Sequence, residues 1–230
     1  MADTIAAIAT GAQVAAIGII RISGPKSLPI VDRLFHPVSG KLMSGYEDRK
    51  LVYGRLTDRS GELLDLCLCT VSHAPHSYTG EDTAELQCHG SPTVLRAALE
   101  ELFHAGARQA LAGEFTKRAF LNGRMELSSA EAVADIIDAE SIECAKNAAA
   151  QLSGAVAVKA DNIYSTLTDI SSHYHAVLDY PDEDIEDFQL ESYEGSLTSA
   201  LTELERLLQS HERGKLMTGG IPAAIAGRPN

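Results

Sequence analysis

The first half of this chain is built around an apolar, β-branched stretch, Ala15-Ala-Ile-Gly-Ile-Ile-Arg-Ile-Ser23. Such residues suit the pleated surface of a sheet, so the stretch predicts a strand. Further strand-like runs lie on both sides of it, at Thr4–Thr10, Lys50–Thr57, Glu62–Ser72 and Asp82–His89. Because short strands recur through the whole first half, we expect them to form a β-sheet with its own core.

Two helices and a hairpin are expected among these strands. Pro25–Phe35 carries apolar residues at helical spacing. Ser91 followed by Pro92 is a typical helix start, and that helix should end near Gly106. Asp58-Arg-Ser-Gly61 is a good turn between two of the strands. The first half therefore predicts a mixed α/β domain.

The second half is predicted to be helical almost throughout. Ser128-Ser-Ala-Glu131 fits a capping box that opens a helix through Asp138. Ser141–Tyr180 has no proline, and it predicts one continuous helix of roughly 55–60 Å at 1.5 Å per residue. A third helix, ending by Gly214, is predicted from a stripe of leucines at Leu197, Leu201, Leu204 and Leu208. Such helices need packing partners, so we expect an incomplete bundle. The fold class is α+β.

Composition and charge indicate a change of domain along the chain. The 230 residues are 45% hydrophobic and 22% charged, as in ordinary globular proteins. Residues 1–120 hold 12 Lys/Arg and 13 Asp/Glu, net −1, whereas residues 121–230 hold 7 and 19, net −12. The acidic second half is therefore not expected to grip a phosphate backbone by itself. We expect domains at 1–120 and 121–216, with a third beginning at 217–230.

Neither a membrane span nor a metal site is predicted. No apolar run approaches the ~20 residues that span a bilayer, and the N-terminus does not read as a signal peptide. Four cysteines without a CxxC pair are interpreted as reduced thiols of a cytoplasmic protein. A metal site from Glu85, Cys88 and His89 is disfavoured, because Cys88 points to the other face of its strand. The acidic stretch 182–187 is interpreted as a solvated loop or helix cap rather than a calcium loop.

Arg21 and Glu85 are the strongest candidates for a binding site in the first half. Arg21 interrupts an apolar strand, so it either lies at a sheet edge or projects into a pocket as an anion receptor. Glu85, Gln87 and His89 alternate with apolar residues and share one strand face. This face either recognises a heterocycle by hydrogen bonds or is a solvated strand surface.

Two further stretches carry weaker signals. Gly113–Arg124 holds three basic residues near two aromatics, and it is either a small cationic patch or a helix end. Near the C-terminus, the apolar strand predicted at Ile221–Ala226 leads into Gly227-Arg-Pro-Asn230. A strand that opens onto a glycine turn is how a phosphate-binding loop begins, although only the first part of that motif is present.

Taken together, these stretches resemble the bacterial and organellar tRNA modification GTPases of the MnmE (TrmE) family. The resemblance spans the chain in order and rests on Gly18-Ile-Ile-Arg-Ile-Ser-Gly24, Ser77-Tyr-Thr-Gly-Glu-Asp82, Glu85-Leu-Gln-Cys-His-Gly90, Gly113-Glu-Phe-Thr-Lys-Arg-Ala-Phe-Leu-Asn-Gly123, Ala130-Glu-Ala-Val-Ala-Asp-Ile-Ile-Asp138, Leu178-Asp-Tyr-Pro-Asp-Glu183 and Ile225-Ala-Gly-Arg-Pro-Asn230. It implies an N-terminal domain similar to the tetrahydrofolate-binding domain of the glycine-cleavage T-protein. That domain forms a homodimer and binds a 5-formyl-tetrahydrofolate-type one-carbon donor.

The resemblance also assigns roles to individual residues. The family's folate-contacting arginine, glutamate and lysine fall on Arg21, Glu85 and Arg124, the last being a departure from lysine. Gly227 and Asn230 fall at the start of the nucleotide-binding loop, whose lysine and hydroxyl residue follow in the family. No catalytic residue is predicted within these 230 residues, and the chain alone is expected to be inactive towards GTP.

For the full-length protein, the resemblance implies a GTPase that uses Mg²⁺ and K⁺. With its FAD-dependent partner MnmG, it acts on carbon 5 of the wobble uridine of tRNA. Two alternatives stay open at this point. One is a stand-alone tetrahydrofolate-binding protein or aminomethyltransferase relative. The other is a dimerisation scaffold that binds no ligand.

Overall fold

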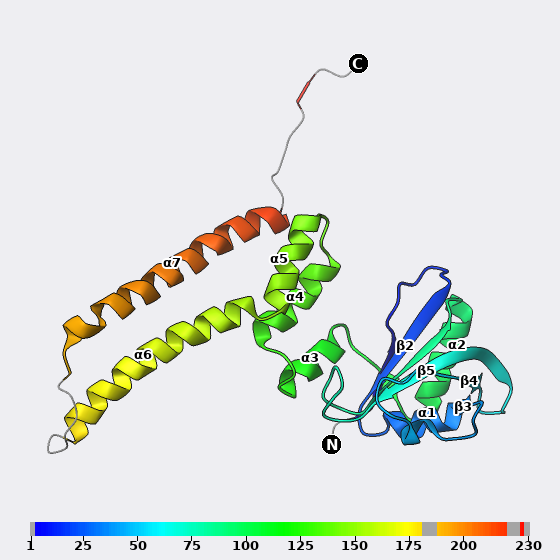
Figure 1. Ribbon diagram of the computed structural model, residues 1–230. Coiled ribbons are helices and arrows are strands. Elements are labelled where there is room, and N and C mark those ends of the chain that lie inside the picture. Colours follow the sequence, from blue (N-terminus) through cyan, green and yellow to red (C-terminus); the bar gives the residue numbers. More distant parts are fainter. Residues whose placement is uncertain (1–2, 181–187, 220–225, 228–230) are drawn as a thin grey trace. The chain divides into compact units, whose positions relative to one another are not determined.

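The chain forms two compact units, Met1–Met125 and Glu126–Asn230. We describe a computed structural model that covers residues 3–180, 188–219 and 226–227, with side chains through residue 210 and at 226–227. The division after Met125 lies five residues beyond the predicted boundary at 120/121. Figure 1 shows strands and short helices in the first unit, and helices alone in the second.

A seven-stranded sheet forms the centre of the first unit, in the order β3-β4-β5-β6-β2-β1-β7. The strands are β1 (Ile5–Ile8), β2 (Ile17–Ser23), β3 (Phe35–Pro37), β4 (Val52–Thr57), β5 (Leu63–Ser72), β6 (Thr83–His89) and β7 (Arg108–Gln109). Neighbouring strands are antiparallel except β1 and β7, which are parallel. The five strands predicted in the first half of the sequence are confirmed, and so is the hairpin between β4 and β5.

The sequence did not predict β3 and β7. They contain three and two residues, too few to show an alternating pattern. Phe35 was assigned to the end of the preceding helix, but that helix, α1 (Ser27–Leu34), ends one residue earlier. The chain then extends so that Phe35 pairs with Leu56 of β4.

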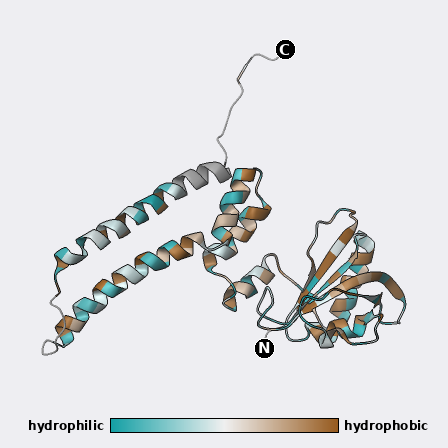
Figure 2. Cartoon of the chain, in the orientation of Figure 1, coloured by the Kyte–Doolittle hydropathy of each residue, from teal (hydrophilic) through white to brown (hydrophobic). Residues whose placement is uncertain are grey.

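Two helices, α1 and α2 (Pro92–His104), pack on the sheet and bury its apolar face. β2 buries Ile20 and Ile22 completely and leaves the alternate residues Ile19 and Arg21 half-buried. Gly18 lies against α2, since a Cβ there would lie 2.4 Å from a Leu95 methyl carbon. The brown strands of Figure 2 mark this apolar core. The sheet therefore has one face sealed by helices and a second face that carries polar groups.

Two shorter helical elements complete the first unit. A 3₁₀ turn, η1 (Met43–Gly45), packs against α1, and α3 (Glu114–Leu121) follows β7. The stretch Gly113–Arg124 was interpreted as either a cationic patch or a helix end. It contains a complete helix, with Arg118 in its last turn.

The second unit consists of α4 (Leu127–Ile137), α5 (Ile142–Leu152), α6 (Ala155–Asp179) and α7 (Leu190–Gly219). The predicted single helix over Ser141–Tyr180 is wrong, because it is divided into α5 and α6. Gly154 has φ +83°, a left-handed conformation that ends a helix and is easy only for glycine. α7 also continues past Gly214, where the sequence predicted its end.

The predicted capping box at Ser128–Glu131 is wrong as well. α4 begins at Leu127, so both residues lie inside the helix, and Glu126 occupies the cap position without a side-chain hydrogen bond. This part of α4 contacts α5: the side-chain amide of Gln151 donates to the backbone carbonyl of Ser128 at 3.2 Å, and the Ser129 hydroxyl donates to the backbone carbonyl of Gln151 at 3.5 Å.

No helix within the described part of the chain is long and apolar enough to cross a membrane. The acidic stretch 182–187 lies outside the described residues, as does most of the strand predicted at Ile221–Ala226.

Candidate functional site

Arg21 and Glu85 meet on the sheet face that α1 and α2 leave uncovered. Arg21 lies in β2, an interior strand between β6 and β1, which rules out a position at the sheet edge. The strand register places it directly opposite Glu85. Its Nε donates to Glu85 Oε1 at 2.8 Å, and the two side chains are 30% and 28% exposed. The two residues that the sequence singled out therefore form one partly buried ion pair.

Two aromatic rings flank the Arg21 guanidinium. Its Cζ lies 5.1 Å from the centroid of Tyr78 and 5.7 Å from that of Phe115. A cation within about 6 Å of an aromatic face is attracted by the ring's quadrupole. The Tyr78 hydroxyl also hydrogen-bonds Thr116 of α3 at 3.0 Å. Arg21 is thus held in one orientation by a carboxylate and two rings, which favours a pre-organised site.

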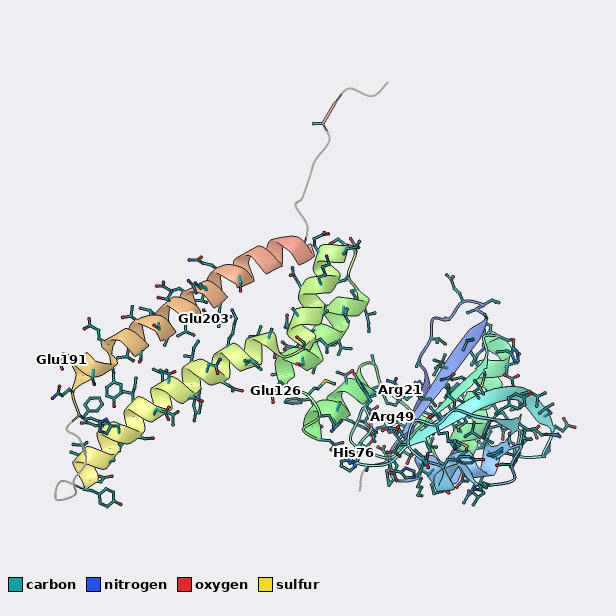
Figure 3. All side chains as sticks on the ribbon, in the orientation of Figure 1. Arg21, Arg49, His76, Glu126, Glu191 and Glu203 are labelled. Atoms are coloured by element: carbon teal, nitrogen blue, oxygen red, sulfur yellow. The ribbon has the colours of Figure 1, made fainter. Side chains whose placement is uncertain are left out.

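A cavity of about 340 Å³ opens over this ion pair. Its lining includes Arg21, Glu85 and Gln87 on the sheet, Tyr78 on the neighbouring loop, and Arg49. Figure 3 labels Arg21 and Arg49 in this unit. Gln87 shares the Glu85 face as predicted, whereas His89 contacts Asp65 and is absent from the lining. The size and mixed lining suit part of a drug-sized ligand.

Charge within the cavity is not balanced. Glu85 offsets Arg21, whereas the Arg49 guanidinium donates to a backbone carbonyl, that of His76, at 2.7 Å. Among the described residues, the Arg49 guanidinium has no carboxylate within ion-pair distance. Its backbone has φ +62°, a left-handed conformation that costs a non-glycine residue about 1 kcal/mol. The cavity therefore presents a net positive charge beside a hydrogen-bonding carboxylate.

Thr70 is a further feature of the lining. Its Oγ1 is the one buried side-chain N or O atom among the described residues that has no hydrogen-bond partner. Thr70 pairs with Glu85 across β5 and β6. An orphaned hydroxyl beside the Glu85 carboxylate is a polar group that a ligand can satisfy.

Arg118 fixes the loop that carries Tyr78. From α3, its guanidinium contacts both oxygens of Glu81 at 3.0–3.1 Å, and it donates to the Asp3 carbonyl at 2.7 Å and to the Asp3 carboxylate at 2.6 Å. Ser23 of β2 donates to the same Glu81 carboxylate at 2.7 Å. Burial opposes the charge of Arg118, but its hydrogen bonds with Glu81 and Asp3 prevail, so its pKa lies above the usual value.

A second arginine extends this ion network. Arg108 pairs with Asp3 and with Glu114 at the start of α3. Its hydrogen bond holds the pKa of Glu114 at about 2, and it is likewise the main cause of the pKa of about 2 at Asp3. The N-terminal segment, the Tyr78 loop and α3 are therefore tied together by charged groups beside the cavity.

Arg124, the third predicted folate contact, lies behind the Tyr78 loop. Its Nε donates to the Ser77 carbonyl at 3.1 Å, and its Cγ and Cδ approach the position of a Cβ on Gly80. It is absent from the cavity lining. Of the two nucleotide-loop residues, Gly227 belongs to neither helix nor strand, and Asn230 lies outside the described residues.

Sequence reasoning missed several residues of the cavity. Tyr78 lay within a quoted motif, and an aromatic residue two positions before a loop glycine was the available signal. Arg49 carried no signal, because its role depends on a left-handed backbone that no local pattern announces. Thr70 belongs to a strand that the sequence predicted, but its pairing with Glu85 is a property of the sheet.

Known families match both units of the chain. Residues 4–124 match a family described as the GTP-binding protein TrmE N-terminus, and residues 127–222 match the MnmE helical domain. The chain belongs to the TrmE (MnmE) family. The two matched segments correspond to the two structural units, with an α/β domain followed by a helical one.

Individual relatives of the TrmE family support this assignment. The chain is 42% identical over 228 residues to a protein of Symbiobacterium thermophilum named tRNA modification GTPase MnmE. Proteins of the same name from Clostridioides difficile and Carboxydothermus hydrogenoformans are 40% and 41% identical. These alignments cover 99–100% of the chain and 50% of each relative. The chain thus spans about half the length of the relatives it matches.

Proposed function

We propose that the first unit binds a reduced folate of the 5-formyl-tetrahydrofolate type in the cavity over Arg21 and Glu85. The observation that carries this proposal is the partly buried ion pair at the base of a cavity, in a chain of the TrmE family. A pterin presents neighbouring N–H donors along one edge, and a carboxylate such as Glu85 accepts them in bidentate fashion. The anionic glutamate tail of folate suits the net positive charge supplied by Arg49.

Arg21 has a double role in this proposal. It orients Glu85 through the 2.8 Å contact, and it presents a cation between Tyr78 and Phe115 to the ligand. Arg124 acts from a distance, since its contact with the Ser77 carbonyl holds the Tyr78 loop. We therefore expect Glu85 and Arg21 to matter more for folate affinity than Arg124.

Calorimetric titration of 5-formyl-tetrahydrofolate into the 230-residue chain tests this site. Glu85→Ala should weaken binding by roughly 5- to 150-fold, the equivalent of about 1–3 kcal/mol for a buried group left unpaired. Arg21→Ala should weaken it to a similar extent. The matched controls Arg33→Ala and Glu100→Ala replace exposed residues on the helices that cover the other sheet face. Unchanged affinity in both site variants, with intact thermal melts, would refute the assignment.

We also propose that the first unit forms a homodimer through the sheet face that bears the cavity. Ile17, Tyr53 and Leu66 alternate with core residues on β2, β4 and β5, and they are exposed in the single chain. Exposed apolar side chains of this size favour a protein partner. Sedimentation at tens of micromolar should show a dimer, and Tyr53→Glu should shift it towards monomer. A monomeric wild-type chain at that concentration would exclude this dimer.

For the whole protein, we propose a GTPase that takes part in modifying carbon 5 of the wobble uridine of tRNA. The support is the name shared by the relatives, tRNA modification GTPase MnmE. In this proposal Mg²⁺ and K⁺ assist GTP hydrolysis, the FAD-dependent protein MnmG is the partner, and the complex assembles on tRNA in the cytoplasm. The 230 residues hold neither the lysine nor the hydroxyl residue that completes a Gly-x-x-x-x-Gly-Lys-Ser/Thr loop after Gly227.

We therefore expect the 230-residue chain by itself to bind no GTP. Titration with a fluorescent GTP analogue should give no saturable signal, and micromolar affinity would contradict this expectation. The same chain should still bind the folate. Two alternatives to this function are a stand-alone folate protein and a dimerisation scaffold that binds no ligand. If the chain is a scaffold, it should bind no folate. A stand-alone protein leaves the helical-domain match at residues 127–222 without a role.

A further inference from the structure

A second cluster of functional side chains lies on the core face of the sheet, away from the cavity. Asp65 and Cys67 of β5 and Cys88 of β6 bring one ligand oxygen and two sulfurs within 4.8 Å of one another. Cys67 and Cys88 are 4% and 2% exposed, and the Asp65 side chain is 8% exposed. We propose that these three residues bind a thiophilic divalent metal ion, for which Zn²⁺ is the best fit.

The strand register brings the three side chains together. β5 and β6 pair Leu68 with Gln87, so the next residues outward, Cys67 and Cys88, lie opposite each other. Asp65 precedes Cys67 by two residues and points to the same face. The sequence disfavoured a metal site with Glu85 and His89 because Cys88 points away from them. That same orientation places Cys88 beside Cys67.

The donor set matches the chemistry of zinc. Two thiolates and a carboxylate are ligands that Zn²⁺ accepts at about 2.3 Å and 2.0–2.2 Å, with tetrahedral geometry. Ligand atoms in such a site lie about 3.5–3.8 Å apart, so the present cluster needs to contract by at most about 1 Å. Soft thiolates disfavour Mg²⁺ and Ca²⁺. The fourth position is open to a water molecule from the strand end, where the His89 side chain is 74% exposed.

Asp65 is already oriented for this role. Its Oδ1 accepts the Leu66 amide at 2.8 Å and the imidazole Nδ1 of His89 at 2.7 Å, and its Oδ2 accepts the His89 amide at 2.8 Å. A carboxylate offers about four lone-pair positions, so one on Oδ2 is left for a metal. Hydrogen bonds of this kind fix a ligating carboxylate, which makes His89 a positioning residue.

Metal binding at this site exchanges protons for the ion. Cysteine binds a metal ion as the thiolate, so each of the two thiols gives up its proton on binding. When the ion enters, two S–H bonds break, two metal–sulfur bonds form, and two protons pass to solvent. No electron is transferred. The product has one negative charge, from two thiolates, one carboxylate and one dication.

Cobalt titration of the chelator-treated 230-residue chain, kept reduced with a phosphine, tests the proposal. We expect CoCl₂ to produce sulfur-to-cobalt charge-transfer bands that saturate at one ion per chain and disappear on addition of ZnCl₂. Cys67→Ala and Cys88→Ala should lose these bands. His89→Ala should weaken binding by about 10-fold or more, as expected for an outer partner of a metal ligand.

Two matched controls use the remaining cysteines. Cys69→Ala replaces another buried thiol of β5, and Cys144→Ala replaces one in the second unit; both should keep the bands. Asp65→Asn keeps the shape of the side chain and should weaken binding at least tenfold. If a cysteine variant fails to fold, the cobalt titration of the wild-type chain still tests the proposal. Absence of charge-transfer bands in the folded, reduced wild-type chain overturns the proposal, and so does their survival in Cys67→Ala.

Discussion

The two units of this chain use their apolar residues in opposite ways. Among the described residues of the first unit, 25 apolar residues are buried, including large ones such as Phe35, Leu86 and Leu102. The second buries four among its described residues, Ala132, Ala148, Ile163 and Ala200, and exposes many leucines along α6 and α7. Both units contain well-formed secondary structure, but in the part of the chain that the structure describes only the first has a core of its own.

This contrast shows that helix formation and core formation are separable. α6 and α7 follow the helical pattern, yet most of their leucines remain in solvent within this chain. Figure 2 shows teal and white residues interrupting the brown ones along the described part of both helices. Helices of this kind gain most of their stability from packing. Stability should therefore be concentrated in the first unit, where the candidate cavity lies.

The largest effect is expected from core truncation. Leu86→Ala in β6 removes a fully buried side chain and should destabilise the first unit by about 2–5 kcal/mol. Leu208→Ala in α7, where the leucine is 69% exposed, should change stability by less than about 0.5 kcal/mol. Urea unfolding followed by hydrogen exchange of each unit measures both. Equal losses would show that α7 is packed as tightly as the sheet.

Removal of an ion pair should likewise destabilise the first unit more than the second. Arg118→Ala leaves Glu81 and Asp3 without their buried partner and should cost about 3 kcal/mol. Arg206→Ala removes an exposed arginine of α7 that pairs with Glu203, and it should cost less than about 0.5 kcal/mol. Arg118→Ala should also weaken folate binding, because the Tyr78 loop loses its anchor. Thermal melts together with calorimetric titration separate the two losses.

Glycine substitutions test whether backbone conformation limits the second unit. Gly154→Ala forces a Cβ into a left-handed conformation and should destabilise the α5–α6 connection by about 1 kcal/mol. Gly195→Ala lies within α7, with no atom within 4 Å of the added Cβ, and should stabilise that helix by about 0.5–1 kcal/mol. Far-UV circular dichroism during thermal melting reports both. Stabilisation by Gly154→Ala would contradict the assigned helix break.

The smallest effect on stability is expected from lowering the pH. Glu114 and Asp3 have a pKa of about 2, below their ordinary values of 4.5 and 3.8. A lowered pKa stabilises the folded state above the ordinary pKa, and this contribution disappears as pH falls towards 2. The first unit should therefore lose stability between about pH 4.5 and pH 2. Urea midpoints measured across that range should fall less steeply for Glu114→Gln, and an identical slope would exclude Glu114 as a cause.

The parts of the structure that the sequence predicted are those with a local signal. β2 and the β4–β5 hairpin follow from β-branched runs and a glycine turn. Arg21 was found because it interrupts an apolar strand, and Glu85 because it alternates with apolar residues on one strand face. The break at Gly154 was missed because an isolated glycine is compatible with a helix, and its left-handed conformation becomes apparent only from the backbone.

The rest of the site depends on contacts between distant residues. Arg118 and Asp3 are 115 residues apart, and Thr70 faces Glu85 only because β5 and β6 pair in one register. No spacing within a single motif encodes these distances. The Asp65–Cys67–Cys88 cluster was missed for the same reason, since its members come from two strands.

The parallel pairing of β1 with β7 has a consequence for synthesis on the ribosome. β1 is made first, but Arg108 and Gln109, its partners at one edge, are made about 100 residues later. The Arg118–Asp3 contact likewise joins α3 to the N-terminal segment. The nascent chain must therefore hold an unpaired strand edge until β7 has emerged, and long-range closure of this kind is slow. A ribosome that pauses shortly before residue 108 would leave the first unit open, with its opening strand exposed to chaperones or to another nascent chain.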